Sequence, residues 1–137
     1  MREGRDVLLV TTGIMLQHSM KAADALAGHG ISVGVLYFPT VKPFDTAALL
    51  AAARGVPLVA AVEEHTEIGG LGAAVAEALL EAACAPAAGM LRLAIPDVFA
   101  TKYGSQELLL AHFGIDADGI VRRVSERIGI HAKKKIA

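Results

Sequence analysis

Short runs of β-branched and aliphatic residues alternate with longer segments of helical period along the chain. The apolar runs at 7–12, 31–38, 57–62 and 90–95 predict four strands. The third run shows no alternation of polar and apolar positions, which is typical of a strand that is covered on both faces in a parallel sheet.

Segments with a helical period lie between and after these strands. Leu16, Met20, Ala23 and Ala27 recur at helical spacing, so they predict a helix over 15–27 with these residues on its buried face. Further helices are expected at 45–54, 71–84 and 105–113, and a last one from Asp116 or Asp118. Asp45 and Ser105 are expected to cap their helices through their side chains.

The order of these elements predicts a fold class. Alternating strands and helices with short connections indicate an α/β three-layer sandwich with a mostly parallel sheet. A chain of 137 residues is expected to form a single domain over 1–137. The basic end at Lys133, Lys134 and Lys135 is expected to be a solvated tail.

Composition and charge exclude several classes. Hydrophobic residues make up 54% and charged residues 20%, so the chain is not a disordered segment. A net charge of −1 without a basic face argues against a nucleic-acid partner. The longest run without charged residues, Ala25–Val41, has 17 residues and is broken by glycines and a proline, so no membrane span is expected. A charged start without an apolar core, and a single cysteine, fit a cytoplasmic protein.

A glycine-rich turn stands between the third strand and the helix that follows, at Gly69, Gly70 and Gly72. Such turns often bind phosphates, but the dinucleotide pattern G-x-G-x-x-G is incomplete because position 75 is Val. Nearby carboxylates would also repel a phosphate at the helix N-terminus. We therefore favour tight chain reversal with close packing of helix on sheet.

Glu63, Glu64 and His65 resemble an acid–base cluster at the carboxyl end of a buried strand, where open α/β sheets place ligands. Adjacent residues of an extended chain point in opposite directions, so the three side chains need not converge. The favoured alternative is that they close a loop or contact a partner chain.

Other reactive residue types form no recognisable site. The five histidines, at 18, 29, 65, 112 and 131, lack metal-ligand spacing, so no metal site is expected. Cys84 is expected to be a small packed residue, and neither a P-loop nor a G-x-S-x-G motif is present. We assign no catalytic, cofactor-binding or metal-binding residue, and the chain suits a domain that assists chemistry done elsewhere.

The stretch at 62–79, VEEHTEIGGLGAAVAEAL, resembles the signature of the transketolase C-terminal domain. The resemblance continues in REGRDVLLVTTG, GISVGVLYFPTVKPFDTAALL and LAIPDVFATKYGSQELLLAHFGIDADGIVRRV, in the same order. The E-E-H triplet is more similar to split, two-gene transketolases. Deoxyxylulose-phosphate synthases and 2-oxo acid dehydrogenase beta subunits tend to have a small residue where His65 stands.

The resemblance implies a five-stranded α/β sheet, mostly parallel with one antiparallel strand. It also implies thiamine diphosphate and Mg²⁺ in the full enzyme. There one domain binds the diphosphate and metal through a G-D-G…N motif, and a pyrimidine-binding domain supplies the activating glutamate. This chain has neither that motif nor room for those domains. It is expected to bind no cofactor, to be inactive alone, and to be an excised domain or one piece of a divided enzyme.

The resemblance also leads us to expect partners, namely those two domains and a homodimer of the assembly. The expected interface includes the loop from Glu63 to Gly72, where the glycines would permit close approach. Pro96 and Asp97 would fix the turn after the fourth strand. Gly70→Val is expected to weaken association while the domain stays folded.

Two alternative functions stay open. The chain could end a 2-oxo acid dehydrogenase beta subunit or a deoxyxylulose-phosphate synthase, or it could be a free-standing regulatory or ligand-binding module.

Overall fold

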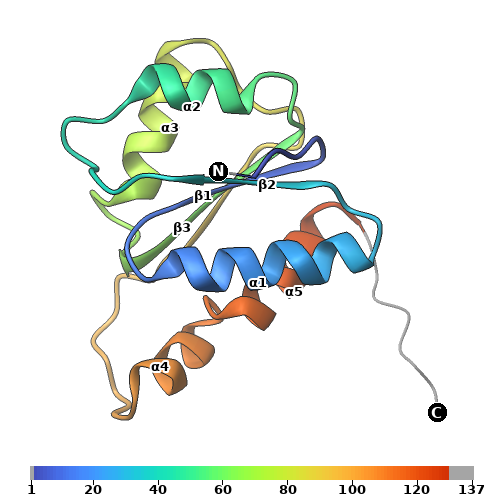
Figure 1. Ribbon diagram of the computed structural model, residues 1–137. Coiled ribbons are helices and arrows are strands. Elements are labelled where there is room, and N and C mark those ends of the chain that lie inside the picture. The colour runs from blue at the N-terminus through green and yellow to red at the C-terminus, as the bar shows by residue number, and fades with distance from the viewer. Residues whose placement is uncertain (1, 130–137) are drawn as a thin grey trace.

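The computed structural model describes residues 2–129 (Figure 1). In chain order the elements are β1 (Val7–Thr11), α1 (Met15–Gly28), β2 (Val33–Tyr37), α2 (Thr46–Ala53), β3 (Leu58–Thr66), α3 (Leu71–Glu81), β4 (Met90–Ile95), α4 (Gln106–Phe113) and α5 (Ala117–Arg127). The expected basic tail, Lys133 to Lys135, and His131 lie outside the described residues.

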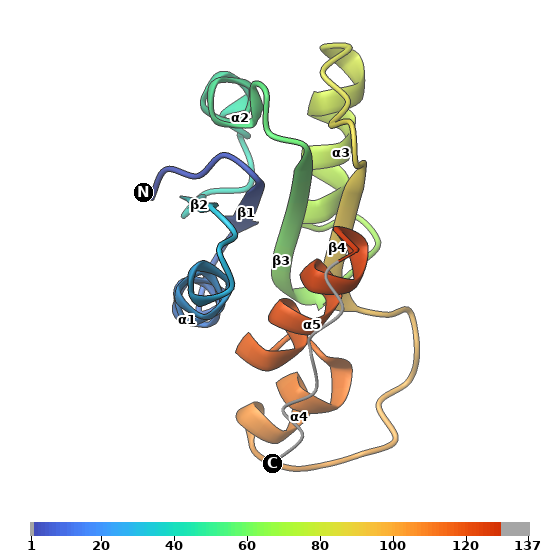
Figure 2. The same cartoon turned by 90° about the vertical axis from the view of Figure 1, so that its right-hand side faces the viewer.

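Parallel strand pairing organises the fold. The strands of residues 2–129 form one sheet in the order β2-β1-β3-β4, and each neighbouring pair is parallel. Helices α2 and α3 cover one face, and α1 and α5 cover the other, with α4 beside α5 (Figures 1 and 2). The predicted α/β three-layer sandwich with a parallel sheet is confirmed.

The expectation of a fifth, antiparallel strand is wrong for the part of the chain that the structure describes. Antiparallel pairing is limited to one bridge at the sheet edge, where Arg2 and Val35 exchange backbone hydrogen bonds of 3.1 and 2.8 Å. Gly4 then passes so close over β2 that a Cβ there would lie 1.9 Å from the Gly34 nitrogen. The Arg5 N–H then donates to the Ser32 carbonyl at 3.2 Å, so this segment follows the edge of β2 but forms no strand of its own.

The alternation of side chains along β1 divides the core into two clusters. Val7 and Leu9 face α1 and α5, whereas Leu8 and Val10 face α2 and α3. Because β1 and β3 have apolar side chains on both faces, both are fully enclosed, as the run at 57–62 predicted.

The buried face of α1 differs from the predicted one. Of the four predicted residues only Ala23 is fully buried, and Met20 and Ala27 are exposed. The buried face consists of Met15, His18, Ser19, Ala22, Ala23 and Leu26. Two polar residues belong to this face, so hydrophobicity alone did not reveal it.

Helix α3 ends three residues earlier than predicted. The N–H groups of Ala83 and Cys84 donate to the carbonyls of Leu80 and Leu79, at 3.0 and 2.9 Å, and Ala83 has a φ of 51°. This is a Schellman ending with alanine at the left-handed position usually held by glycine, so no glycine marks the end of the helix.

None of the helices within residues 2–129 combines the length and the apolar character that crossing a bilayer would require.

Candidate functional site at the carboxyl edge of the sheet

The residues that the sequence singled out lie where β3 and β4 end. Strand β3 continues to Thr66, with an irregular register against β4 between Val62 and Thr66. The sequence predicted that Glu63, Glu64 and His65 belong to a loop. This prediction is wrong, because all three are residues of β3. Their side chains must leave the strand on different sides, and the structure places them in different surroundings.

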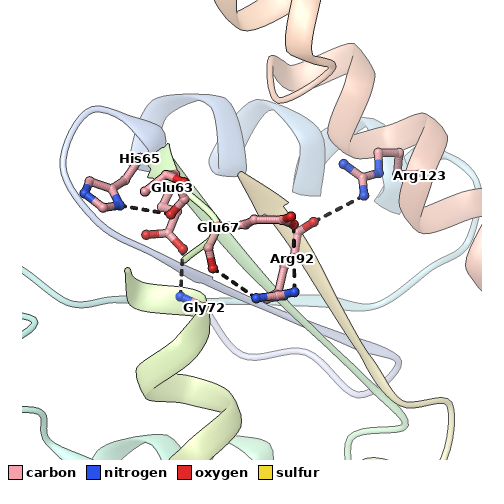
Figure 3. A network of polar contacts seen from close by, with 7 residues as sticks. Glu63, His65, Glu67, Gly72, Arg92 and Arg123 are labelled. Carbon is pink, nitrogen blue, oxygen red and sulfur yellow. Dashed lines mark hydrogen bonds and ion pairs between the residues drawn. The ribbon is translucent and has the colours of Figure 1, made fainter. Parts of the chain in front are cut away.

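Glu63 is buried, with 2% of its surface exposed, and its carboxylate lies against the start of α3. Its Oε2 accepts a hydrogen bond from the Leu71 N–H at 2.7 Å, and its Oε1 accepts one from the Gly72 N–H at 2.8 Å (Figure 3). These N–H groups have no partner within the helix, and the helix dipole favours a negative charge there. Glu63 thus caps α3 from a neighbouring strand.

The position of this carboxylate explains why two of the three positions in the turn are glycine. A Cβ at Gly70 would lie 2.0 Å from Glu63 Oε2, and one at Gly72 would lie 3.1 Å from both Glu63 Oε1 and Arg92 Cδ. Gly69 has a φ of +73°, a conformation that side chains disfavour. The turn is therefore built around an internal carboxylate.

A diphosphate does not fit this turn. The backbone donors that would bind a phosphate already donate to Glu63, and the carboxylate would repel a second anion. The preference for close helix–sheet packing over phosphate binding agrees with this geometry.

Glu64 and His65 do not join Glu63 in a cluster. The exposed carboxylate of Glu64 accepts two contacts from Gln106 Nε2, at 2.9 and 3.1 Å, which ties β3 to the start of α4. His65 Nδ1 lies 2.9 Å from the Thr66 carbonyl oxygen, to which it donates in the Nδ1-protonated tautomer. The arrangement supplies three separate tethers and no proton relay.

Two arginines that sequence reasoning missed complete the polar edge. Arg92 Nη1 donates to the Glu67 carbonyl at 3.0 Å, and Nη2 lies 3.8 Å from Glu67 Oε2. Arg123 Nη2 donates to the Arg92 carbonyl at 3.2 Å, so α5 is joined to the same network (Figure 3). For Arg92 the sequence did hold a signal, because it is a charged residue inside the otherwise apolar run at 90–95.

Pro96 and Asp97 are exposed and begin the connection from β4 to α4. The Val98 N–H donates to the Pro96 carbonyl at 2.8 Å, which closes a turn. The Glu67 N–H donates to the Ile95 carbonyl at 2.9 Å, so this turn starts beside the loop that leads into α3.

The edge holds no recognisable reaction centre. No group of three or more His, Cys, Asp or Glu residues between positions 2 and 129 is arranged to hold a metal ion. Cys84 is half-buried and packs against the cluster beneath α2 and α3. The hydrogen bonds of this edge join β3, β4, α3, α4 and α5 into one polar frame.

Most of the chain is similar to proteins of the transketolase family. The family model for the transketolase C-terminal domain matches residues 1–120. A transketolase family protein of Sinorhizobium fredii, y4mN, is 42% identical over 92% of this chain and 36% of its own length. The 6-deoxy-6-sulfo-D-fructose transketolase subunit SqwH of a Clostridium species is 41% identical over 92% of this chain and 38% of its own.

A second kind of relative is equally similar in sequence. The 1-deoxy-D-xylulose-5-phosphate synthase of Syntrophotalea carbinolica is 38% identical over 90% of this chain, but only 19% of that enzyme is covered. Among solved structures, a split gene transketolase in an inactive beta4 tetramer is 34% identical with a TM-score of 0.83. The match covers 96% of this chain and 42% of that one.

The chain thus spans between about a fifth and two fifths of the length of these relatives. The match in sequence covers residues 1–120, and the match in fold covers 96% of the chain. The chain belongs to the transketolase C-terminal domain family.

Proposed function

We propose that this chain is the C-terminal part of a transketolase-like enzyme, and that the complete assembly moves a two-carbon ketol unit between sugar phosphates. The observation that carries the proposal is the family match over residues 1–120 in a chain that covers only 36–42% of its transketolase-type relatives. We further propose that residues 1–137 act as one domain.

Thiamine diphosphate and Mg²⁺ would be bound by the other two domains of the assembly. The cofactor supplies an electron sink for the carbanion formed when a carbon–carbon bond breaks. This chain's own contribution differs, because the helix N-terminus at the glycine-rich turn is filled by Glu63. In this proposal the chain is inactive alone.

The role of the chain would be to hold neighbouring domains in place. Glu63, Glu64 and Arg92 tie α3, α4 and the end of β3 into one frame at the carboxyl edge. A frame of this kind loses little conformational entropy on binding, which favours docking. Contacts of Glu64, His65, Gly69, Pro96 and Asp97 with the pyrimidine-binding domain or a second protomer belong to this proposal.

Self-association is also part of the proposal. The solved split gene transketolase is a beta4 tetramer, so one kind of subunit assembles with itself in that protein. By similarity we propose that this chain associates with a second copy within a cytoplasmic assembly.

A deoxyxylulose-phosphate synthase is the second candidate, because several of these enzymes are 38–41% identical to the chain. The donor substrate distinguishes the two. We would combine the chain with a protein that carries the diphosphate- and pyrimidine-binding domains, and add thiamine diphosphate and Mg²⁺. A transketolase uses a ketose phosphate donor, whereas the alternative consumes a 2-oxo acid. Turnover of only the 2-oxo acid would reject the ketol-transfer proposal.

A further inference from the structure

The connection between β4 and α4, together with the first turn of α4, carries a concentration of exposed apolar side chains. Of the nine large hydrophobic residues that lie exposed among residues 2–129, four fall between positions 98 and 108. They are Val98, Phe99, Tyr103 and Leu108, with exposed fractions of 59%, 97%, 94% and 66%, and we call them the edge patch. Such a grouping in water indicates a surface that another molecule covers.

The segment that carries the edge patch is tethered at both ends. At its start, Glu67 donates its N–H to Ile95, the last residue of β4. At its end, Ser105 accepts a hydrogen bond from the Leu108 N–H, and Glu64 accepts one from Gln106. Figure 1 shows this segment leaving the sheet at the edge where α1 begins and passing outside the body before α4. Phe99 and Tyr103 are therefore exposed on a segment whose two ends are held by hydrogen bonds.

Two opposite charges flank the aromatic residue Phe99. Asp97 precedes it by two positions and Lys102 follows it by three, and both are exposed. Neither side chain forms an ion pair with any residue of the described part of the chain. A segment with an acid on one side of its apolar centre and a base on the other is complementary to itself when it is turned by two-fold symmetry.

We propose that the edge patch is a self-association surface, in which Phe99 and Tyr103 of two copies pack together and Asp97 of each copy faces Lys102 of the other. The occupant is thus a second copy of this chain, because that copy presents the complementary charges in the required order. This inference gives a surface to the self-association proposed above and rests on that part of the proposed function.

Sedimentation velocity over a concentration series tests the apolar part. The unmodified chain should show reversible association, and Phe99→Ser or Tyr103→Ser should raise the dissociation constant by about tenfold or more. Leu80→Ser is the matched control because Leu80 is 77% exposed near the end of α3, away from the patch, and it should leave association unchanged. Urea unfolding of each variant checks that the fold is kept.

A charge exchange tests the pairing itself. Asp97→Lys alone and Lys102→Asp alone should each weaken association several-fold by placing like charges together. The double variant should restore it, because opposite charges again face each other. A chain that stays monomeric at all concentrations overturns the inference. So does association that is unaffected by Phe99→Ser, or a double variant that fails to recover. None of these results depends on ketol transfer, so they leave the activity proposal standing.

Discussion

The carboxylate of Glu63 connects three features of the carboxyl edge. It is buried in β3, it accepts the first free N–H groups of α3, and it occupies the space that side chains at positions 70 and 72 would need. The sequence showed an acidic residue and a glycine-rich turn side by side. It could not show that they contact each other, because that depends on β3 extending past Val62 and turning Glu63 inward.

Glu63→Gln should destabilise the protein. Both carboxylate oxygens accept N–H groups, so an amide would place a donor against a donor and would remove the charge at the helix N-terminus. We expect a loss of about 1–3 kcal/mol in the free energy of unfolding, measured by urea denaturation. Glu64→Gln is the control, since Glu64 is exposed, and it should change stability by less than about 0.5 kcal/mol. Equal losses in the two variants would contradict the assigned role of Glu63.

Substitution of Gly70 should also act on the fold itself. The sequence led us to expect that Gly70→Val spares the domain, but the Cβ position 2.0 Å from Glu63 Oε2 indicates an internal clash. We expect Gly70→Ala to cost about 1–3 kcal/mol. The cost should shrink markedly in a Glu63→Ala background, because the clashing atom is then absent.

Gly28→Ala serves as the control for Gly70→Ala, since no atom lies within 4 Å of a Cβ at position 28 and it should be nearly neutral. If the cost of Gly70→Ala is the same with and without the Glu63 side chain, the proposed clash is wrong.

At the scale of elements, local signals were sufficient wherever a side chain caps its own helix. Asp45 and Ser105 accept N–H groups three residues ahead, at 2.9 and 3.4 Å, as predicted. For the last helix two starts were left open, and Asp116 is the residue that caps it, at 3.0 Å. For α3 the start at Leu71 was predicted, but its cap, the Glu63 carboxylate of a neighbouring strand, was not. The end of α3 was predicted three residues too late, because alanine holds the left-handed position of its Schellman turn.

Helix α5 offers a test of this capping. Asp116 accepts the Gly119 N–H, whereas Asp118 lies exposed in the first turn and accepts no backbone N–H within residues 2–129. Asp116→Ala should lower the free energy of unfolding by about 1 kcal/mol, and Asp118→Ala by clearly less. The two variants are compared by their urea midpoints. A larger effect at position 118 would show that charge near the helix end matters more than the capping bond.

At the scale of the whole molecule, the apolar runs predicted the four strands. Their alternation with helices predicted the three layers and the parallel sheet. The fifth strand was implied by family resemblance, and within residues 2–129 antiparallel pairing is limited to the Arg2–Val35 bridge. Family membership could be inferred from the segment at 62–79, since that motif and its neighbours occur in order. The edge patch could not be inferred from the sequence, because the exposure of Phe99 and Tyr103 depends on where the 96–105 connection runs.

We propose that this chain supports an enzyme whose reaction centre lies in other domains. The most direct test of this proposal is a titration of the chain into a fixed amount of protein that supplies the diphosphate- and pyrimidine-binding domains. Thiamine diphosphate, Mg²⁺, a ketose phosphate and an aldose phosphate are present throughout. We expect no ketol transfer by the chain alone, and a rate that rises until the two proteins are equimolar and then stays constant. Ketol transfer by the chain alone, or a rate that does not respond to its addition, would contradict the account.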